Sequence, residues 1–496
     1  MLGNFCYDCI EKYLPYQFKM KTDTKISAKK SWGKALARPA EEFPLTQLLV
    51  KNGKIPEGLR GTLYRNGPAR LERGGIPVGH WFDGDGAILA VHFTDAGAAA
   101  VYRYVQTAGY QAEEKANRFL YSNYGMAAAG PAWLRWTKPV KNAANTSVLA
   151  LPDRLLALWE AGLPHSLDLQ TLETIGIDYL GNSGGEFPYS AHYKRDPMTG
   201  IIYNFGVTLG ATTKLNLYKS DATGKIVQKA AVALDGFPAI HDFVLAGKYL
   251  IFFVPPVRLK IWPVLAGIST MGDSFEWKPE LGTQILVIDS ETLSLVSRGK
   301  TEPWYQWHFA NGFVKEDGSV AVDFVRLADF KTNERLKEVA TGELRSDGEG
   351  SLWRVHLNPQ TAKVIATEEL LDKPCEFPVV PAAEIGQESR YIYLAMYRPD
   401  VDILPEVYGT IARFDTQSRN LTIADCGENG YPAEPIYVPD TSSEKGWVVT
   451  VVYDGDSDSS EVWIFDSDRL SDSPVCQLEL PGVIPFGFHG TWNSAV

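Results

Sequence analysis

The sequence predicts an all-β protein, most simply a seven-bladed β-propeller in which large loops and a few short helices form a dome over one face. Two observations predict this fold. The chain has 496 residues, well above the usual single-core domain, and 44 glycines and 30 prolines punctuate it throughout. A hairpin-like unit also recurs seven times along it. A propeller lets one large molecule accept that many tight turns.

The repeated unit is an alternating apolar strand, a polar turn, and a second alternating strand. One or two further strand-like runs lie between successive copies, which brings each unit near the four strands of a propeller blade. The spacing is irregular, so large loops must be inserted on one face, and we expect function in those loops. The copies span residues 91–104, 165–177, 215–228, 284–297, 352–365, 411–424 and 462–475.

We expect two parts along the chain: an N-terminal tail over residues 1–45 and a single propeller domain over residues 46–496. No second domain is indicated. Outside the tail, the best candidate for a helix is the stretch 332–342.

The tail contains apolar residues, but Asp8, Glu11 and Lys12 interrupt them. The sequence therefore predicts neither a secretion signal nor a membrane-spanning helix. A short amphipathic helix on a membrane surface, followed by the lysine-rich stretch 19–30, stays open as an alternative.

Charge and cysteine content limit the partners and the compartment. The formal net charge is −12, and outside the first thirty residues no stretch concentrates Lys and Arg, which argues against nucleic-acid binding. Five cysteines without regular spacing favour a reducing compartment such as the cytoplasm over a disulfide framework. Cys6 and Cys9 form a single CxxC, which we interpret as incidental because no second pair accompanies it.

Four of the eight histidines lie in apolar or aromatic runs, where a lone histidine is usually a core residue. None shows the local spacing of metal ligands, so a metal site would require the fold to bring distant strand ends together. A propeller does this at its axis, where four imidazoles could hold Fe, Zn, Cu or Ni. The four are His192, His241, His308 and His489. The others, His80, His92, His165 and His356, we interpret as structural or exposed.

Three glutamates each interrupt an apolar stretch, where an unpaired charge would be costly. A common partner for such a carboxylate is the outer N–H of a metal-bound histidine, which it orients. A structural salt bridge or a backbone cap is the competing interpretation. The three are Glu160, Glu376 and Glu434.

Longer motifs run from GTLYRNGP at residues 61–68 to FHGTW at the C-terminus. Those between them are HWFDGDG, NAANTS, RLLALWEAG, SAH, IHDF, WHFAN, CEFP and EPIYVP. With these motifs the chain resembles the carotenoid cleavage oxygenases, which include carotenoid dioxygenases of plants and cyanobacteria and the retinoid isomerase of the eye. Within that family it is most similar to the cyanobacterial apocarotenoid oxygenases. The resemblance covers nearly the whole chain.

The resemblance implies a seven-bladed propeller with Fe(II) on its axis and no carboxylate among the ligands. By motif, the ligands would be His192, His241, His308 and His489. Glu160, Glu376 and Glu434 match the acids that orient three of these histidines. Thr146 matches a residue whose methyl group partly shields one coordination position, which leaves another position for O₂.

The implied activity is cleavage of one double bond in a carotenoid or apocarotenoid with O₂, giving two carbonyl compounds. Such a polyene needs a long apolar tunnel, and Trp159, Trp307 and Phe488 are candidates for its lining. Ordinary core packing is an equally good interpretation of these aromatics. Ala239 replaces an aromatic residue of the family's apocarotenoid oxygenase, so a full-length carotenoid also stays possible.

A water-insoluble substrate has to enter from a membrane, and two segments mix aromatic, aliphatic and cationic residues as an interfacial patch should. They span residues 119–136 and 257–271. We expect peripheral membrane contact there; loops packed on the propeller are the alternative.

Two other functions stay open. A non-catalytic propeller could bind a partner on its loop face, but the four histidines and three glutamates would then be a coincidence. A non-cleaving isomerase of the same family would be distinguished by its independence of O₂.

Overall fold

The computed structural model describes residues 30–128, 130 and 138–495, and the tail residues 1–29, with Cys6 and Cys9, lie outside them. Within the described chain, strands dominate and helices are few and short. The expected all-β, propeller-like fold is therefore confirmed. Seven of the sheets formed by these residues have four or more strands, and two further sheets have two strands each.

Neighbouring strands within a sheet are antiparallel, and most sheets follow chain order. The first contains β1 (Phe43–Gln47), β7 (Gly97–Tyr104), β6 (Asp85–Thr94), β3 (Gly61–Arg70) and β35 (Gly490–Ser494). The second contains β11 (Thr174–Ile177), β10 (His165–Leu167), β9 (Leu155–Leu158) and β8 (Ser147–Ala150). The third contains β12 (Lys194–Arg195), β13 (Ile202–Thr208), β14 (Thr213–Ser220) and β15 (Ile226–Leu234).

The fourth sheet contains β16 (Val244–Ala246), β17 (Tyr249–Val254), β20 (Thr283–Asp289) and β21 (Leu295–Thr301). The fifth contains β22 (Phe309–Val314), β23 (Val320–Leu327), β24 (Gly350–Asn358) and β25 (Lys363–Leu371). The sixth contains β26 (Cys375–Val379), β27 (Tyr391–Met396), β28 (Thr410–Asp415) and β29 (Leu421–Ile423). The seventh contains β2 (Leu49–Gly53), β34 (Cys476–Glu479), β33 (Ser459–Asp466), β32 (Gly446–Asp454), β30 (Gly430–Pro432) and β31 (Ile436–Pro439).

The hairpins predicted from the repeat are present, each in a different one of these sheets. They are β6–β7, β10–β11, β14–β15, β20–β21, β24–β25, β28–β29 and β33–β34. Burial distinguishes the strands of a sheet: β17 is buried along its whole length, whereas β15 alternates over most of its length. A continuous apolar run thus forms an inner strand, and an alternating run forms a half-exposed one.

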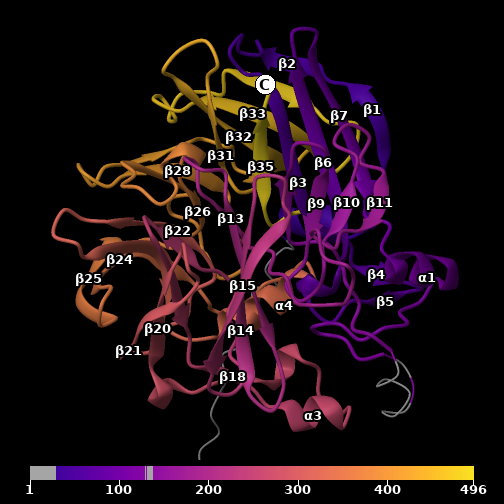
Figure 1. The fold of residues 1–496 in the computed structure, drawn as a ribbon. Coiled ribbons are helices and arrows are strands. Elements are labelled where there is room, and N and C mark those ends of the chain that lie inside the picture. The colour runs from indigo at the N-terminus through magenta and orange to yellow at the C-terminus, as the bar shows by residue number, and fades with distance from the viewer. Residues whose placement is uncertain (1–29, 129, 131–137, 496) are drawn as a thin grey trace, which may run out of the picture.

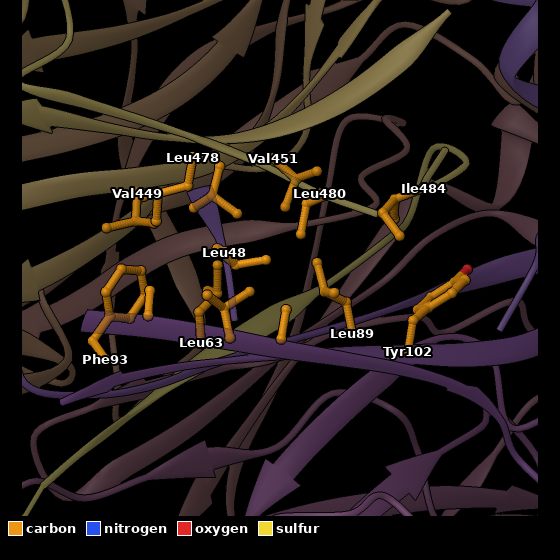
Figure 2. Packing of buried hydrophobic residues seen from close by; sticks show 14 of the residues in the cluster. Leu48, Leu63, Leu89, Phe93, Tyr102, Val449, Val451, Leu478, Leu480 and Ile484 are labelled. Carbon is orange, nitrogen blue, oxygen red and sulfur yellow. The ribbon is translucent and has the colours of Figure 1, made fainter. Parts of the chain in front are cut away.

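The two ends of the chain close the ring of sheets. The C-terminal strand β35 pairs with β3 of the first sheet, and the early strand β2 pairs with β34 of the last. Figure 2 shows the core between these two sheets. Leu63, Leu89 and Phe93 pack there against Val451 and Leu478, so this seam is held by buried apolar contact as well as by strand pairing.

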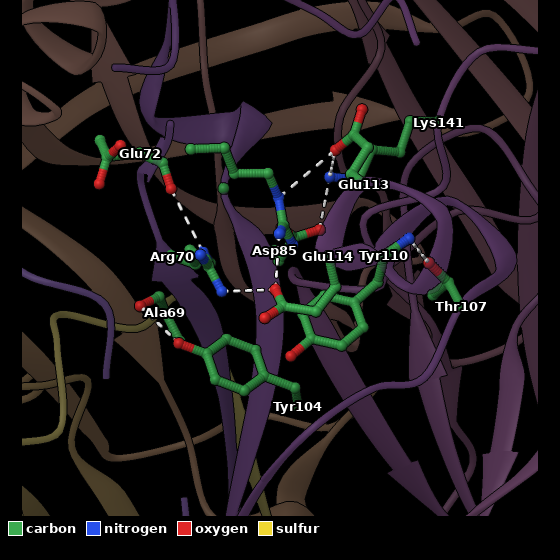
Figure 3. Close-up of polar contacts among 12 residues, drawn as sticks. Ala69, Arg70, Glu72, Asp85, Tyr104, Thr107, Tyr110, Glu113, Glu114 and Lys141 are labelled. Carbon is green, nitrogen blue, oxygen red and sulfur yellow. Dashed lines mark hydrogen bonds and ion pairs between the residues drawn. The ribbon is translucent and has the colours of Figure 1, made fainter. Parts of the chain in front are cut away.

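A buried ion network fixes the loop after the first sheet. Lys141 Nζ lies 2.5 Å from Asp85 Oδ1 and 2.6 Å from Glu113 Oε2, and Arg73 contacts Asp85 at 2.8 Å (Figure 3). Glu113 belongs to α1 (Ala108–Ala116), and Thr107 caps that helix by accepting from the Tyr110 N–H. Because every charge in this group has a partner, the network can be buried.

Two further helices lie in the loops: α3 (Ile261–Leu265) and α4 (Thr332–Val339). The helix expected at residues 332–342 is thus confirmed. Among the described residues, no helix is long and apolar enough to span a membrane. Short 3₁₀ turns include η1 (Ser31–Leu36) and η2 (Trp81–Asp83). Trp32 in η1 is fully buried, so the chain contacts the body of the protein before residue 46.

Candidate metal centre

The four histidines lie at the starts of strands that each form one end of a different sheet. His308 and His489 directly precede β22 and β35, while His192 and His241 lie within three residues of β12 and β16. In Figure 1, β22 and β35 lie nearer the middle of the molecule than β25 and β1, at the opposite ends of the same sheets. Strand ends far apart in the sequence therefore meet in one place.

The remaining three larger sheets each contribute one further predicted site residue in the same way. Thr146 directly precedes β8, Glu376 is the second residue of β26, and Glu434 lies two residues before β31. Glu160 differs, because it follows β9 in a turn.

The imidazoles are close enough to share one ion. Nε2 of His192 lies 3.0 Å from Nε2 of His241, which lies 3.3 Å from Nε2 of His308. One nitrogen from each of these and from His489 falls within 4.8 Å of all the others. Two nitrogens bound at about 2.1 Å and at right angles on one ion are about 3 Å apart, so the spacing suits a metal.

Two of the three predicted glutamates contact the outer nitrogen of a histidine. Glu376 Oε2 lies 2.5 Å from His308 Nδ1, and Glu434 Oε1 lies 2.9 Å from His489 Nδ1. Both carboxylates are buried. Glu434 is also paired with buried Arg65 at 3.3 Å and accepts from the Gly490 N–H.

Glu160 is placed more loosely. Its Oε1 lies 3.4 Å from His241 Nδ1, and its side chain keeps 32% of its surface exposed. Oε1 itself is buried and has no hydrogen-bond partner among the described residues. Glu160 therefore lies beside His241 without forming a hydrogen bond to it.

Thr146 is buried beside the cluster. Its carbonyl accepts from the His489 N–H at 3.2 Å, and its hydroxyl donates to Asn145 Oδ1 at 3.1 Å. With the hydroxyl engaged, the methyl group is the part of this side chain left for other contacts.

Asp242, next to His241 in the IHDF motif, was missed by the sequence reasoning. Its Oδ1 lies 3.7 Å from His192 Nδ1 and 2.9 Å from Lys194 Nζ, while Oδ2 accepts from the Phe309 N–H at 3.0 Å. One carboxylate thus joins the segments that carry three of the histidines. A charge inside an apolar run is the signal that could have identified it.

Phe377 was also missed. It has a left-handed backbone (φ 51°), which is unusual for an aromatic residue, and its ring stacks on His308 with centroids 5.3 Å apart. The pairing of β26 with β27 shifts register between Glu376 and Val379. Such an irregularity re-aims side chains, here the carboxylate of Glu376 and the ring of Phe377.

Burial and neighbouring charge act differently on the histidines. Burial, helped by the other imidazoles, holds the pKa of His192 well below its ordinary value. Burial also lowers the pKa of His489, against the opposing effect of Glu434. For His308, burial is outweighed by Glu376, and the pKa is raised. Neutral His192 and His489 are the forms that bind metal.

A cavity of about 860 Å³ lies against the cluster. His241, His308 and His489 reach its wall, which consists mainly of aromatic and aliphatic side chains. All three predicted aromatic candidates, Trp159, Trp307 and Phe488, line it, as do Thr146 and Ala239. The cavity is therefore suited to an apolar ligand with one part held beside the four imidazoles.

Only part of the predicted membrane-facing surface can be described, because residues 129 and 131–137 lie outside the described chain. In the segment 257–271, Trp262 is 77% exposed and Ile268 is 82% exposed. Tyr121, Tyr124 and Met271, from the two segments, line the cavity.

The fold and the histidine cluster define a propeller-like protein in which four imidazoles that could hold a metal ion lie beside a mainly apolar cavity. Residues 36–494 match the family model of the retinal pigment epithelial membrane protein. The chain therefore belongs to this family, that of the carotenoid cleavage oxygenases, and the predicted family is confirmed.

Among curated proteins, the chain is 33% identical to apocarotenoid-15,15'-oxygenase of a Synechocystis species, over 89% of this chain and 91% of that one. It is 27% identical to carotenoid 9,10(9',10')-cleavage dioxygenase 1 of Arabidopsis thaliana (90% and 87%) and 26% identical to isoeugenol monooxygenase of Pseudomonas putida (89% and 93%).

Among solved structures, cobalt-substituted Synechocystis apocarotenoid oxygenase matches with a TM-score of 0.84 and 30% identity, over 94% of this chain and 98% of that one. The prediction of an enzyme that cleaves double bonds oxidatively is thus confirmed at the level of the family.

Proposed function

We propose that this protein holds Fe(II) in its histidine cluster and uses O₂ to cleave one double bond of a carotenoid or apocarotenoid. The observation that carries the proposal is the meeting of four imidazole nitrogens, three of them from histidines in the wall of a large, mainly apolar cavity. One C=C bond is replaced by two C=O bonds, so one polyene and one O₂ give two carbonyl compounds without a further reductant. The residues holding the ion would be His192, His241, His308 and His489.

When bound, the iron would supply the activation of O₂. Glu376 and Glu434 keep the Nδ1 proton of His308 and His489 in place, which leaves Nε2 free to face the ion. Glu160 would do the same for His241. The methyl group of Thr146 would narrow the approach to the cluster.

The cavity supplies the rest of the catalysis. Trp159, Trp307 and Phe488 would hold the polyene chain with one double bond beside the cluster and exclude water from it. Because Ala239 is small, the wall near His241 leaves room, and a full-length carotenoid stays a candidate substrate alongside the shorter apocarotenoids.

We further propose that the seven larger sheets are the seven blades of a propeller, that the loops form a dome over one face, and that residues 46–496 make one catalytic domain. One predicted hairpin per sheet supports the blade count. Cys375, Cys426 and Cys476 are free and buried, which supports a reducing compartment such as the cytoplasm.

Peripheral membrane contact through residues 119–136 and 257–271 is the proposed entry route for the substrate. Exposed Trp262 and Ile268 support it. Replacing both with Asp should reduce co-sedimentation with liposomes, and Met198→Asp, a change at an 81% exposed position elsewhere, should not. Unchanged sedimentation of the double variant would contradict this route.

The enzyme is tested by anaerobic purification with metal analysis, followed by incubation under O₂ with a full-length carotenoid, an apocarotenal and isoeugenol. Products are identified by mass. Near-stoichiometric iron and paired carbonyl products would support the proposal and locate the cleaved bond. Folded protein that binds no iron, or that turns over none of the substrates when iron is restored, would overturn it. Turnover to an isomer without O₂ would indicate the isomerase alternative.

A further inference from the structure

A group of four linked polar side chains lines the cavity, whose wall is otherwise mainly aromatic and aliphatic. It consists of Arg335 on α4, Glu349 directly before β24, and Tyr397 and Tyr408 in the segments around β27 and β28. Their surroundings in the wall are aliphatic, including Leu336 and Val407. Polar groups placed singly in an apolar pocket are what usually fixes the orientation of a ligand.

One part of this group is fully used by the protein itself. Arg335 donates to Glu349 Oε1 at 2.8 Å, to the Tyr397 hydroxyl at 2.8 Å, and to the carbonyls of Ser346 and Leu404. The Tyr397 hydroxyl donates to the same Glu349 oxygen at 2.5 Å. Arg335, Tyr397 and Glu349 Oε1 are thus structural, and they hold the carboxylate in place.

The other part keeps unused hydrogen-bonding capacity. Glu349 Oε2 accepts one long bond, from the Tyr408 hydroxyl at 3.3 Å, and that hydroxyl still has its acceptor positions open. Glu349 leaves 15% of its side chain exposed. Since both residues line the cavity, a ligand inside it can reach Glu349 Oε2, which has room for a further donor, and the Tyr408 hydroxyl, whose hydrogen is held only by this long bond.

We propose that Glu349 and Tyr408 form a binding site for a hydroxyl group on the substrate. The substrate hydroxyl would donate to Glu349 Oε2 and accept from Tyr408, so two hydrogen bonds would replace the one long bond between these side chains. Burial holds the pKa of Tyr408 well above its ordinary value, which keeps this donor protonated at neutral pH.

The chemistry of the site favours some end groups of the substrate over others. Arg335 neutralises Glu349, so a neutral group fits best, and the remaining acceptor oxygen would repel a carboxylate. An aldehyde could accept from Tyr408 but could not satisfy Glu349. A hydrocarbon end would leave the two groups with only their long bond to each other, which is a poorer arrangement in a buried site.

The inference rests on the proposed function, because it assumes that an alkene occupies the cavity. The hydroxyl group could belong to the hydroxylated ring of a carotenoid or to a phenol. Two matched pairs of probes separate these sources: a 3-hydroxylated apocarotenal against the same compound without the hydroxyl, and isoeugenol against its methyl ether.

The test compares wild type with Tyr408→Phe, which removes one hydroxyl that makes a single long bond in the protein. Dissociation constants are measured anaerobically by quenching of tryptophan fluorescence, and kcat/KM is measured under O₂. Wild type should prefer the hydroxylated member of one pair, and Tyr408→Phe should reduce that preference about 10-fold or more. The control Tyr179→Phe, also in the cavity wall, should leave the preference unchanged.

The outcomes separate this site from the proposed cleavage. Turnover without any preference for hydroxylated substrates, or a preference that survives in Tyr408→Phe, would overturn the hydroxyl site and leave the cleavage standing. A hydroxyl preference in binding that is lost in Tyr408→Phe, without turnover of any probe, would support the site and count against the cleavage. The pair that shows the preference identifies the source of the hydroxyl.

Discussion

The histidine cluster has two halves that the protein supports differently. His308 and His489, the acid-backed pair, have buried carboxylates 2.5 Å and 2.9 Å from Nδ1. His192 and His241, the open pair, have their nearest carboxylates at 3.7 Å and 3.4 Å, which is beyond a good hydrogen bond. One half is therefore fixed by charge-assisted hydrogen bonds before any metal binds.

Aromatic packing supports His241 of the open pair instead. The ring of His241 meets Trp307 edge-on with centroids 4.8 Å apart, and Trp307 meets Phe82 at 5.7 Å in the same manner. Phe82 in turn packs on His80. Histidines of one cluster are thus oriented by different means, and removing each support should have a different effect on stability or metal affinity.

The largest expected effect is a loss of folding stability when a carboxylate of the acid-backed pair is removed. Glu434→Ala would leave the buried guanidinium of Arg65 without its carboxylate. Removing one partner of a buried ion pair lowers the free energy of unfolding by about 3–5 kcal/mol. Chemical denaturation of the metal-free protein measures this. Glu160→Ala, at a partly exposed position, is the control and should cost about 1 kcal/mol or less; equal losses would contradict the distinction.

The second expected effect is on metal affinity. Glu376→Gln keeps the shape of the side chain but removes the charge facing His308, and we expect iron affinity to fall about 10- to 100-fold. Glu160→Gln should lower it less, because no hydrogen bond to His241 is formed beforehand. Anaerobic competition with a chelator gives both constants, and a larger loss in Glu160→Gln would show that metal binding closes the 3.4 Å gap.

A smaller effect is expected from Asp242. Asp242→Asn would keep the acceptor for the Phe309 N–H but lose the ion pair with Lys194, which should reduce the free energy of unfolding by about 1 kcal/mol. Lys194→Met, which removes the other partner, gives the matched measurement. If both variants were as stable as wild type, Asp242 would not be what joins the segments of the open pair.

The smallest effect is on the pH dependence of stability, and it involves His80, which packs on Phe82 near the open pair. Burial lowers the pKa of His80 to about 3, against 6.5 ordinarily. Between these values the unfolded chain binds a proton that the folded one does not, so stability falls as pH falls. From pH 7 to pH 6 this amounts to about 0.7 kcal/mol. Between pH 7 and pH 6, the free energy of unfolding of wild type should fall by that amount more than that of His80→Asn. Equal changes in the two proteins would mean that His80 titrates in the folded protein as it does in the unfolded chain.

Much of the architecture could be predicted because strand signals are local. The alternation of apolar residues and the polar turns in residues 215–228 are enough to indicate a hairpin, and β14 and β15 occupy that stretch. The histidines were recognisable for a related reason, since each lies in an apolar or aromatic run just before a strand at one end of a sheet.

Other features could not be read from the chain. Glu160, Glu376 and Glu434 look equivalent in sequence, yet only two reach hydrogen-bond distance of a histidine. The left-handed backbone of Phe377 depends on a register shift against β27, and the unused oxygen of Glu349 depends on α4 and two loops meeting over the cavity.

The sequence by itself determined the strand-rich fold, the order of its hairpins and the four histidines placed at strand starts, because periodicity and residue type act over a few neighbouring residues. Only the tertiary structure decided which acid backs which histidine and how closely. The partners His308 and Glu376 are 68 residues apart, and His489 and Glu434 are 55 apart. Their distances depend on how whole sheets pack around the centre, and that packing is a property of the long-range contacts and not of any one segment.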